Sequence, residues 1–261
     1  MPTRIRVSLT EHVVDEAGPL AQTGPAVHAA LLAAVDAVDP SSAEVLHGNA
    51  AKGPKPFSIT PLHQGSEQGR WRVEIGLLTD GLVPPVVAGL QQLDLLRLGH
   101  SSFRVERIDA RGVGYDDLVE HSRPRTRWPL RFRTPTTFRV RADGGPRRGM
   151  PLPDPVLVFP ALLRRWEAFA GGVALPASTA TMALAHLAIG ELRIHTDAHL
   201  TKGPSAYERG FVGDVEYLAV GVRDAPKAAL AGISALVTFA TFAGVGDQTT
   251  KGMGWVDLAG R

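Results

Sequence analysis

The amino-acid sequence predicts an α+β protein in which one order of elements, strand–helix–strand–strand–helix–strand, occurs twice. Two observations support this prediction. Apolar and polar residues alternate in several short segments, which is typical of half-buried strands. Between them lie longer segments whose apolar residues recur every three or four positions, as in helices. The 261 residues suffice for one large domain or for two of about 130 residues each.

The first half of the chain opens with an alternating strand, in which Ile5, Val7 and Leu9 face one way. A helix is expected from Gly24-Pro25, because proline favours the first helical position. Asp39-Pro40 ends this helix and starts a short helical turn through His47. A short extended run at 57–60, a strand at 71–77, a helix at 82–97 and a strand around 103–105 complete the set.

The second half repeats this order. Its elements are a strand from Leu130 that resumes at Phe138, a helix over 155–169, strands around 192–194 and 211–217, a helix over 226–242 and a last strand over 253–258. The repetition predicts two tandem ferredoxin-like (βαββαβ, RRM-like) domains, residues 1–122 and 123–261. The boundary is expected in the arginine-rich stretch near residues 118–128.

Composition excludes several classes of protein. Cysteine is absent, which excludes disulfides and thiolate metal sites. No basic start followed by an apolar run indicates a signal peptide, and the longest apolar stretch, 228–243, is too short to span a bilayer. We therefore expect a cytoplasmic protein with no membrane partner.

Positive charge is concentrated in one stretch although the net charge is only +2. Residues 123–148 contain nine arginines and one acid, Asp143, and such clusters attract polyanions. Arg131 and Arg133 share one strand face, and Arg139 lies on another. The pattern favours RNA binding over the alternative of a solvated face with an interdomain linker, and we single out Arg131, Arg133 and Arg139.

Four motifs occur together in one order. They are LHGNAAKGPKPFSITPL at 46–62, RFRTPTTFR at 131–139, GFVGDVEY at 210–217 and GVGDQTTKGMG at 244–254. With them the sequence resembles, over nearly its whole length, the CRISPR-associated RAMP endoribonucleases that cut precursor CRISPR RNA within its repeats. The resemblance implies metal-free cleavage, without a cofactor. The 2′-hydroxyl attacks the phosphate and leaves 2′,3′-cyclic phosphate and 5′-hydroxyl ends.

The resemblance also implies a catalytic histidine on the first helix or in the loop after it, and this chain has one at each place. His28 lies in the first turn of the helix, whose N-terminus disfavours imidazolium and so favours a general base. His47 closes the next helical turn, whose C-terminus favours the charged form of a general acid or phosphate contact. We expect the two histidines to share the acid and base roles, or one of them to act alone. The non-catalytic alternatives are that His28 is merely partly buried and that His47 only caps its helix.

Further residues are expected to bind RNA. Lys55, in GPKPF, matches the family lysine that faces the scissile phosphate and is the third catalytic candidate, beside Lys52 as an RNA contact. A solvated loop lysine is the alternative for both; it is the preferred explanation of Lys52 and equals the catalytic one for Lys55. The glycine loop, residues 244–254, joins the last helix to the last strand and offers backbone N–H groups to anions. Its expected RNA contacts are Gly244, Gly246, Gln248, Thr249, Thr250, Lys251, Gly252 and Gly254, and the alternative is a structural loop buried between the domains.

His195 and His199 are spaced like helical zinc ligands, but their segment is expected to be extended. Four residues of a strand span about 13 Å, too far for one ion, so no metal site is predicted. The two histidines are expected either on an exposed polar face or facing RNA.

Three functions follow, in order of preference. The first is a nuclease that matures CRISPR RNA, with the repeat RNA as partner and with an effector complex and a homodimer left open. The second is a noncatalytic RAMP subunit that binds CRISPR RNA in an effector complex. The third is a small-molecule enzyme on the same fold, but the chain has no P-loop or dinucleotide fingerprint.

Overall fold

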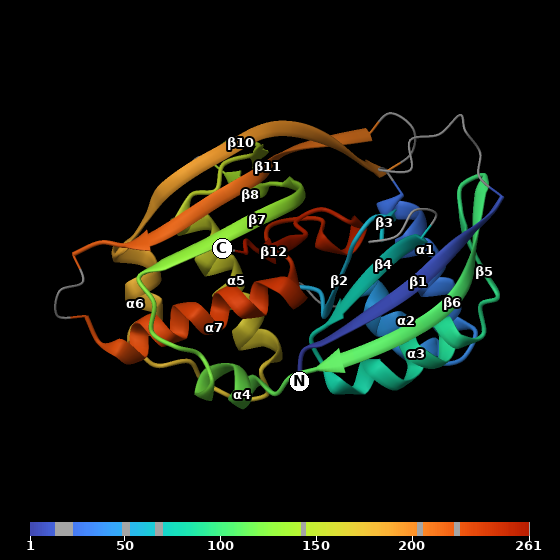
Figure 1. The fold of residues 1–261 in the computed structure, drawn as a ribbon, viewed down its shortest axis with the longest axis horizontal. Coiled ribbons are helices and arrows are strands. Elements are labelled where there is room, and N and C mark those ends of the chain that lie inside the picture. The colour runs from blue at the N-terminus through green and yellow to red at the C-terminus, as the bar shows by residue number, and fades with distance from the viewer. Residues whose placement is uncertain are drawn as a thin grey trace.

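The structure is a computed structural model that describes residues 1–13, 23–48, 53–65, 70–141, 145–202, 206–221 and 225–260 (Figure 1). The elements of the first half are β1 (Thr3–Val13), α1 (Gly24–Asp36), α2 (Pro40–His47), β2 (Phe57–Ile59), β3 (His63–Gln64), β4 (Arg70–Leu77), the 3₁₀ helix η2 (Asp80–Leu82), α3 (Val83–Gln91), β5 (Leu95–Leu98), β6 (Ser101–Gly112) and α4 (Tyr115–Glu120). Those of the second half are β7 (Arg127–Thr136), β8 (Phe138–Arg141), β9 (Arg147–Met150), α5 (Pro155–Phe169), α6 (Ser178–Ala185), β10 (Leu187–Lys202), β11 (Ala206–Ala219), α7 (Lys227–Ala243), the 3₁₀ helix η3 (Thr249–Lys251) and β12 (Val256–Leu258).

Both halves have the strand order of a ferredoxin-like sheet, which confirms the predicted fold class. The N-terminal sheet runs β2-β4-β1-β6-β5 and the C-terminal sheet runs β10-β11-β7-β12, with antiparallel neighbours throughout. In each, the first strand of the motif lies between the third and the fourth, and the second strand lies beside the third. In the first half β5 and β3 are additions to this pattern, and in the second half β8 and β9 form a separate hairpin.

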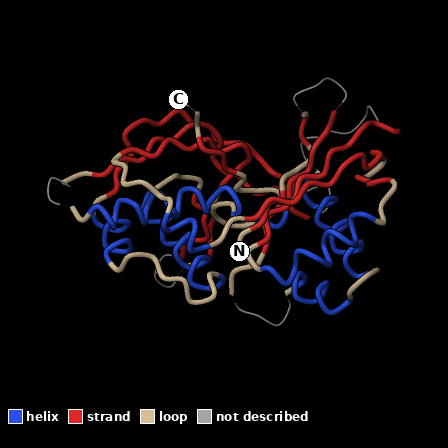
Figure 2. The backbone as a smooth tube through the Cα atoms, turned by 60° about the horizontal axis from the view of Figure 1, so that its bottom comes forward, coloured by secondary structure: helices blue, strands red, loops and turns tan. Residues whose placement is uncertain are grey.

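Helices cover one side of each sheet, so each half has its own apolar core (Figure 2). The first core includes Ile5, Leu31 and Phe103, and the second includes Phe132, Phe159 and Phe239. Alternation accounts for the strands, because every second residue of β1 up to Leu9 is buried.

Some predicted elements differ from those observed. The helix expected over 82–97 ends at Gln91, and the next residues form β5 because Leu96 and Leu98 are buried on either side of the exposed Arg97. The strand does resume at Phe138, but it pairs with β9 rather than with the main sheet. The last strand is shorter than expected because Met253 and Gly254 bond within the glycine loop region.

The two halves meet where the C-terminal end of α7 lies on β2 and β4 (Figure 1). Ser58 Oγ donates to the carbonyl of Phe242 at 2.6 Å. A Cβ on Gly76 of β4 would lie 1.9 Å from that same oxygen, so only glycine permits this approach. The glycine loop therefore begins at the junction of the two halves.

We propose the domain boundary after residue 122, in the arginine-rich connection. The helix α4 precedes this boundary, yet Tyr115 packs against Trp166 at 4.9 Å between ring centroids and belongs to the second core. Within the described residues, no helix has the length and apolar character needed to cross a membrane.

Candidate active site

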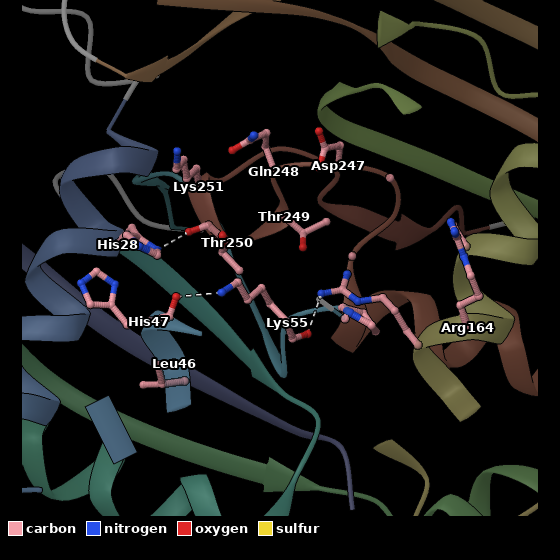
Figure 3. Close-up of a pocket in the computed structure, with 16 residues that line it drawn as sticks. His28, Leu46, His47, Lys55, Arg164, Asp247, Gln248, Thr249, Thr250 and Lys251 are labelled. Carbon is pink, nitrogen blue, oxygen red and sulfur yellow. Dashed lines mark hydrogen bonds between the residues drawn. The ribbon is translucent and has the colours of Figure 1, made fainter. Parts of the chain in front are cut away.

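A cavity of about 770 Å³ lies between the two halves (Figure 3). The N-terminal half contributes side chains of α1, α2 and the segment before β2, and the C-terminal half contributes α5 and the glycine loop. Its lining residues are His28, Leu46, His47, Gly53, Pro54, Lys55, Ala161, Arg164, Arg165, Gly244, Gly246, Asp247, Gln248, Thr249, Thr250 and Lys251. The cavity thus unites segments far apart in sequence and is rich in cations.

His28 reaches the cavity from the first turn of α1 and is held on two sides. Its Nδ1 lies 2.7 Å from the carbonyl oxygen of Thr250, and its ring stacks on Phe57 with 5.8 Å between centroids. Because a carbonyl can only accept, Nδ1 carries a proton, and in the neutral ring Nε2 is the basic nitrogen. Burial lowers the pKa of His28, and the nearby cation Lys251 lowers it further, while the bond to Thr250 opposes this. The lowered pKa agrees with the sequence prediction, but its main cause is burial and not the helix N-terminus.

The helix α2 places His47 at the rim of the cavity. The carboxylate of Asp39 accepts from the N–H groups of Ser41 at 3.1 Å and Ser42 at 3.3 Å, which caps the N-terminus of this helix. Hydrogen bonds from the two serine hydroxyls, together with these backbone bonds, lower the pKa of Asp39 to about 2. Gly48 ends the helix in the left-handed region at φ 59°. His47 therefore occupies the last turn, and its side chain is exposed.

Lys55 is tied to the end of α2. Its Nζ donates to the carbonyl oxygens of His47 at 2.7 Å and Gly48 at 2.8 Å (Figure 3). A Cβ on Gly48 would lie 2.0 Å from this Nζ, so glycine makes room for the ammonium group. An ammonium has three N–H donors, and among the described residues only these two carbonyls accept from it, which leaves one donor for an anion in the cavity. Partial burial lowers the pKa of Lys55.

The glycine loop is both structural and exposed to the cavity. Val245 N–H donates to the carbonyl of Gly254 at 2.9 Å, and Asp247 N–H donates to that of Thr137 at 2.9 Å. Gly246 has φ 82°, and its Cβ would lie 2.4 Å from the Thr137 oxygen, so close backbone packing requires this glycine. The loop lies between the domains, as the structural alternative held, and it also lines the cavity.

Arg165 of α5 lines the cavity and bonds backbone segments of both halves of the chain. It is 7 % exposed, and its guanidinium donates to the carbonyl of Ala243 and, at 3.2 Å each, to those of Lys55 and Phe57. Its Nε has no hydrogen-bond partner among the described residues. No carboxylate of the described residues pairs with this buried charge, and burial lowers the pKa of Arg165 to about 10.

The predicted site residues fall into four groups. The cavity contains His28, His47, Lys55, Gly244, Gly246, Gln248, Thr249, Thr250 and Lys251. Gly252 and Gly254, at the C-terminal end of the loop, are buried and do not line the cavity. Lys52 lies outside the described residues. The remaining group is Arg131, Arg133 and Arg139, which do not line the cavity and stay predictions as RNA contacts.

These three arginines each have an acidic partner. Arg131 bonds Asp214 at 2.6 Å, and Arg133 lies 3.4 Å from Asp257. Arg139 bonds Glu208 at 2.5 Å and Asp247 at 2.8 Å. Their bonds to these acids raise the pKa values of Arg131 and Arg139. RNA would therefore compete with protein carboxylates for these guanidinium groups.

The histidine pair of β10 differs in part from expectation. His195 is exposed, as predicted, but His199 is only 2 % exposed. The prediction of an exposed His199 is wrong because β10 contacts α1, and the Nε2 of His199 donates to the carbonyl of Lys251 at 2.7 Å. Within the described ranges, no group of three or more potential protein ligands could hold a metal ion.

Sequence reasoning missed both arginines of α5. Arg165 shares the helical face of Val158, Leu162 and Trp166, so a charge within an apolar stripe was a readable signal. Arg164, next to it, carries no such signal, because an exposed helical arginine is ordinary.

Comparisons with known proteins agree with the fold and the cavity. The sequence model of the family described as CRISPR-associated endoribonuclease Cas6 matches residues 130–256. A product complex of Cas6 (TTHB231) from Thermus thermophilus is 27% identical, with a TM-score of 0.79 and coverage of 98% of this chain and 99% of that one. A product complex of Cas6 (TTHA0078) is 27% identical, with a TM-score of 0.78 and full coverage of both chains.

More distant relatives share the fold alone. A structure described as that of a Cas6-related gene from Pyrococcus furiosus is 14% identical, with a TM-score of 0.66 and coverage of 99% of both chains. No curated protein sequence matches the chain significantly.

Two ferredoxin-like domains with a glycine-rich loop at their junction define a protein of the RAMP superfamily. More narrowly, the chain is similar to the CRISPR-associated RAMP endoribonucleases described as Cas6, which confirms the resemblance found in its motifs. The family match includes the glycine loop but begins at residue 130, after His28, His47 and Lys55.

Proposed function

We propose that this protein is a metal-independent endoribonuclease that cuts precursor CRISPR RNA within its repeats. One observation carries the proposal: a single cavity contains His28, His47, Lys55 and the glycine loop, which come from both halves of the chain. The two Cas6 structures at 27% identity are described as product complexes, which supports an RNA-cleaving role with repeat RNA as the partner.

In the proposed reaction, the 2′-oxygen before the cut forms a bond to phosphorus while the bond from phosphorus to the 5′-oxygen breaks. His28 Nε2 takes the proton of the 2′-hydroxyl, which suits a ring kept neutral by burial. His47 donates a proton to the leaving 5′-oxygen. The third N–H of Lys55 stabilises the charge that develops on the phosphate.

The test uses a repeat RNA incubated with the purified protein in EDTA. We expect one cut, with 2′,3′-cyclic phosphate and 5′-hydroxyl ends, and no cut when the nucleotide before it is 2′-deoxy. A shifted band without cleavage would instead indicate the noncatalytic RAMP subunit. An effector complex and a homodimer stay proposed as further partners, and size-exclusion chromatography with and without RNA tests the second.

Alanine at either histidine tests the assigned roles. His28→Ala and His47→Ala should each lower the single-turnover rate by about 10²- to 10⁴-fold, while the affinity for 2′-deoxy repeat RNA stays nearly unchanged. His100→Gln, on an exposed turn, is the control. Full activity in both alanine variants contradicts the assignment.

A further inference from the structure

The two arginines of α5 line the same cavity but differ in their partners. The guanidinium of Arg165 is buried and bonded to three carbonyls. Arg164 is exposed and makes no hydrogen bond or ion pair with any described residue. Arg131, Arg133 and Arg139, by contrast, all have carboxylate partners. Among these arginines, Arg164 is the one whose guanidinium an external anion can bind without displacing a carbonyl or carboxylate of a described residue.

The surroundings of Arg164 favour an anion. Asp247 is the only acidic residue that lines the described cavity, and Arg139 already holds its carboxylate at 2.8 Å. The other charged groups in the lining are basic, and Lys251 makes no side-chain bond to a described residue. Figure 3 shows Arg164 across the cavity from His28 and His47, with the glycine loop between them. An anion at Arg164 is therefore separate from one at the histidines.

The glycine loop adds backbone donors to this side of the cavity. The N–H groups of Gly246 and Gln248 have no acceptor among the described residues, although both residues line the cavity. Both residues have positive φ, 82° and 56°, and backbone N–H groups in turn conformations can bind anions. A guanidinium and free N–H groups are the donors that bind phosphate oxygens best.

We propose that Arg164, with the N–H groups of Gly246 and Gln248, forms a subsite for a phosphodiester of the RNA other than the one that is cut. This inference rests on the proposed function, because it takes the histidine side of the cavity as the place of the scissile phosphate. Arg164 is then a binding residue that fixes the path of the strand through the cavity, and the proton transfers stay with the histidines.

The first measurement is the affinity for 2′-deoxy repeat RNA over a range of salt concentrations. Arg164→Ala should weaken binding by about tenfold and lower the slope of log affinity against log salt by about 0.7 to 0.9. Arg164→Lys should keep the slope but lose affinity, because lysine cannot bind two phosphate oxygens as a planar fork. Arg97→Ala, also exposed but on the edge strand β5, is the matched control and should change neither.

The second measurement locates the phosphate. Single neutral methylphosphonate linkages are placed in turn along the 2′-deoxy repeat RNA. At the linkage that Arg164 contacts, the tenfold loss on Arg164→Ala should disappear, and this linkage should not be the scissile one. The proposal is overturned if Arg164→Ala binds as Arg97→Ala does, if no neutral linkage removes the loss, if the scissile linkage does, or if the wild type does not bind the RNA.

Neither measurement needs cleavage, so the two proposals can fail separately. RNA that binds through Arg164 but is never cut refutes the nuclease and keeps the subsite. Cleavage with no role for Arg164 in binding does the reverse.

Discussion

At the scale of single residues, the tautomer of His28 decides what it can do. The Thr250 carbonyl holds the proton on Nδ1, and stacking on Phe57 holds the plane of the ring. Nε2 can therefore accept a proton without reorientation of the imidazole, which is the preorganisation that general base catalysis requires.

The pH dependence of cleavage tests this role. Because burial and neighbouring cations lower the pKa of His28, the acidic limb of kcat/KM should have its midpoint below 6.5, the ordinary value for histidine. Lys251→Ala should move this midpoint upward, since one cation that disfavours imidazolium is removed. The measurement is the single-turnover rate at low RNA concentration between pH 5 and 8. A midpoint above 6.5 in the wild type would contradict the base role.

At the scale of secondary-structure elements, α5 connects the two domains through Arg165. Its three carbonyl acceptors come from the end of α7 and from both sides of Pro56, so one side chain joins the start of the glycine loop to the Lys55 segment. A buried cation without a carboxylate is costly, so its retention here suits a positioning role.

Replacing Arg165 should loosen this junction. Arg165→Met leaves buried carbonyls without donors, which cost about 1–3 kcal/mol each, so we expect the free energy of unfolding to fall by ~2–4 kcal/mol. Arg165→Lys keeps the charge and some bonds and should be intermediate. Urea unfolding measures both, with Arg164→Met as the exposed neighbouring control. Equal stability of Arg165→Met and the wild type would show that the carbonyls find other donors.

How far the sequence could predict these elements depends on how local their causes are. The helix over 155–169 matches α5 because Pro155 and the apolar spacing are local signals. The cavity residues His47 and Lys55 were found within a motif, and His28 through the position on the first helix that the family resemblance implies. In contrast, the burial of His199 depends on α1, which is distant in sequence, and the hairpin of β5 and β6 was hidden by leucines that also fit a helix.

At the scale of the whole molecule, three partly or fully buried histidines lie at the junction of the domains. His28 contacts Thr250, His63 packs on Trp255 at 4.4 Å between centroids, and the carbonyl of Lys251 accepts from His199. Burial is the main cause that lowers the pKa of each. The titratable groups that act on His28 are Lys251, His47 and Lys55. Those that act on His63 are Glu74, Arg72 and Arg133, and Asp197 acts on His199.

The junction should therefore weaken in acid. A histidine with a lowered pKa in the folded state contributes its full stability above pH 6.5, its unfolded value, and loses it as the pH falls toward the folded value, because the unfolded chain binds the proton first. Each such histidine costs at most about 1.4 kcal/mol per pH unit over that window. We expect the urea midpoint to fall between pH 7.5 and 5.5, before the carboxylates titrate. His199→Gln can still donate to the Lys251 carbonyl and should flatten this dependence, whereas His100→Gln should not. A midpoint that is constant over this range would show that the junction opens freely enough for these rings to titrate as they do in water.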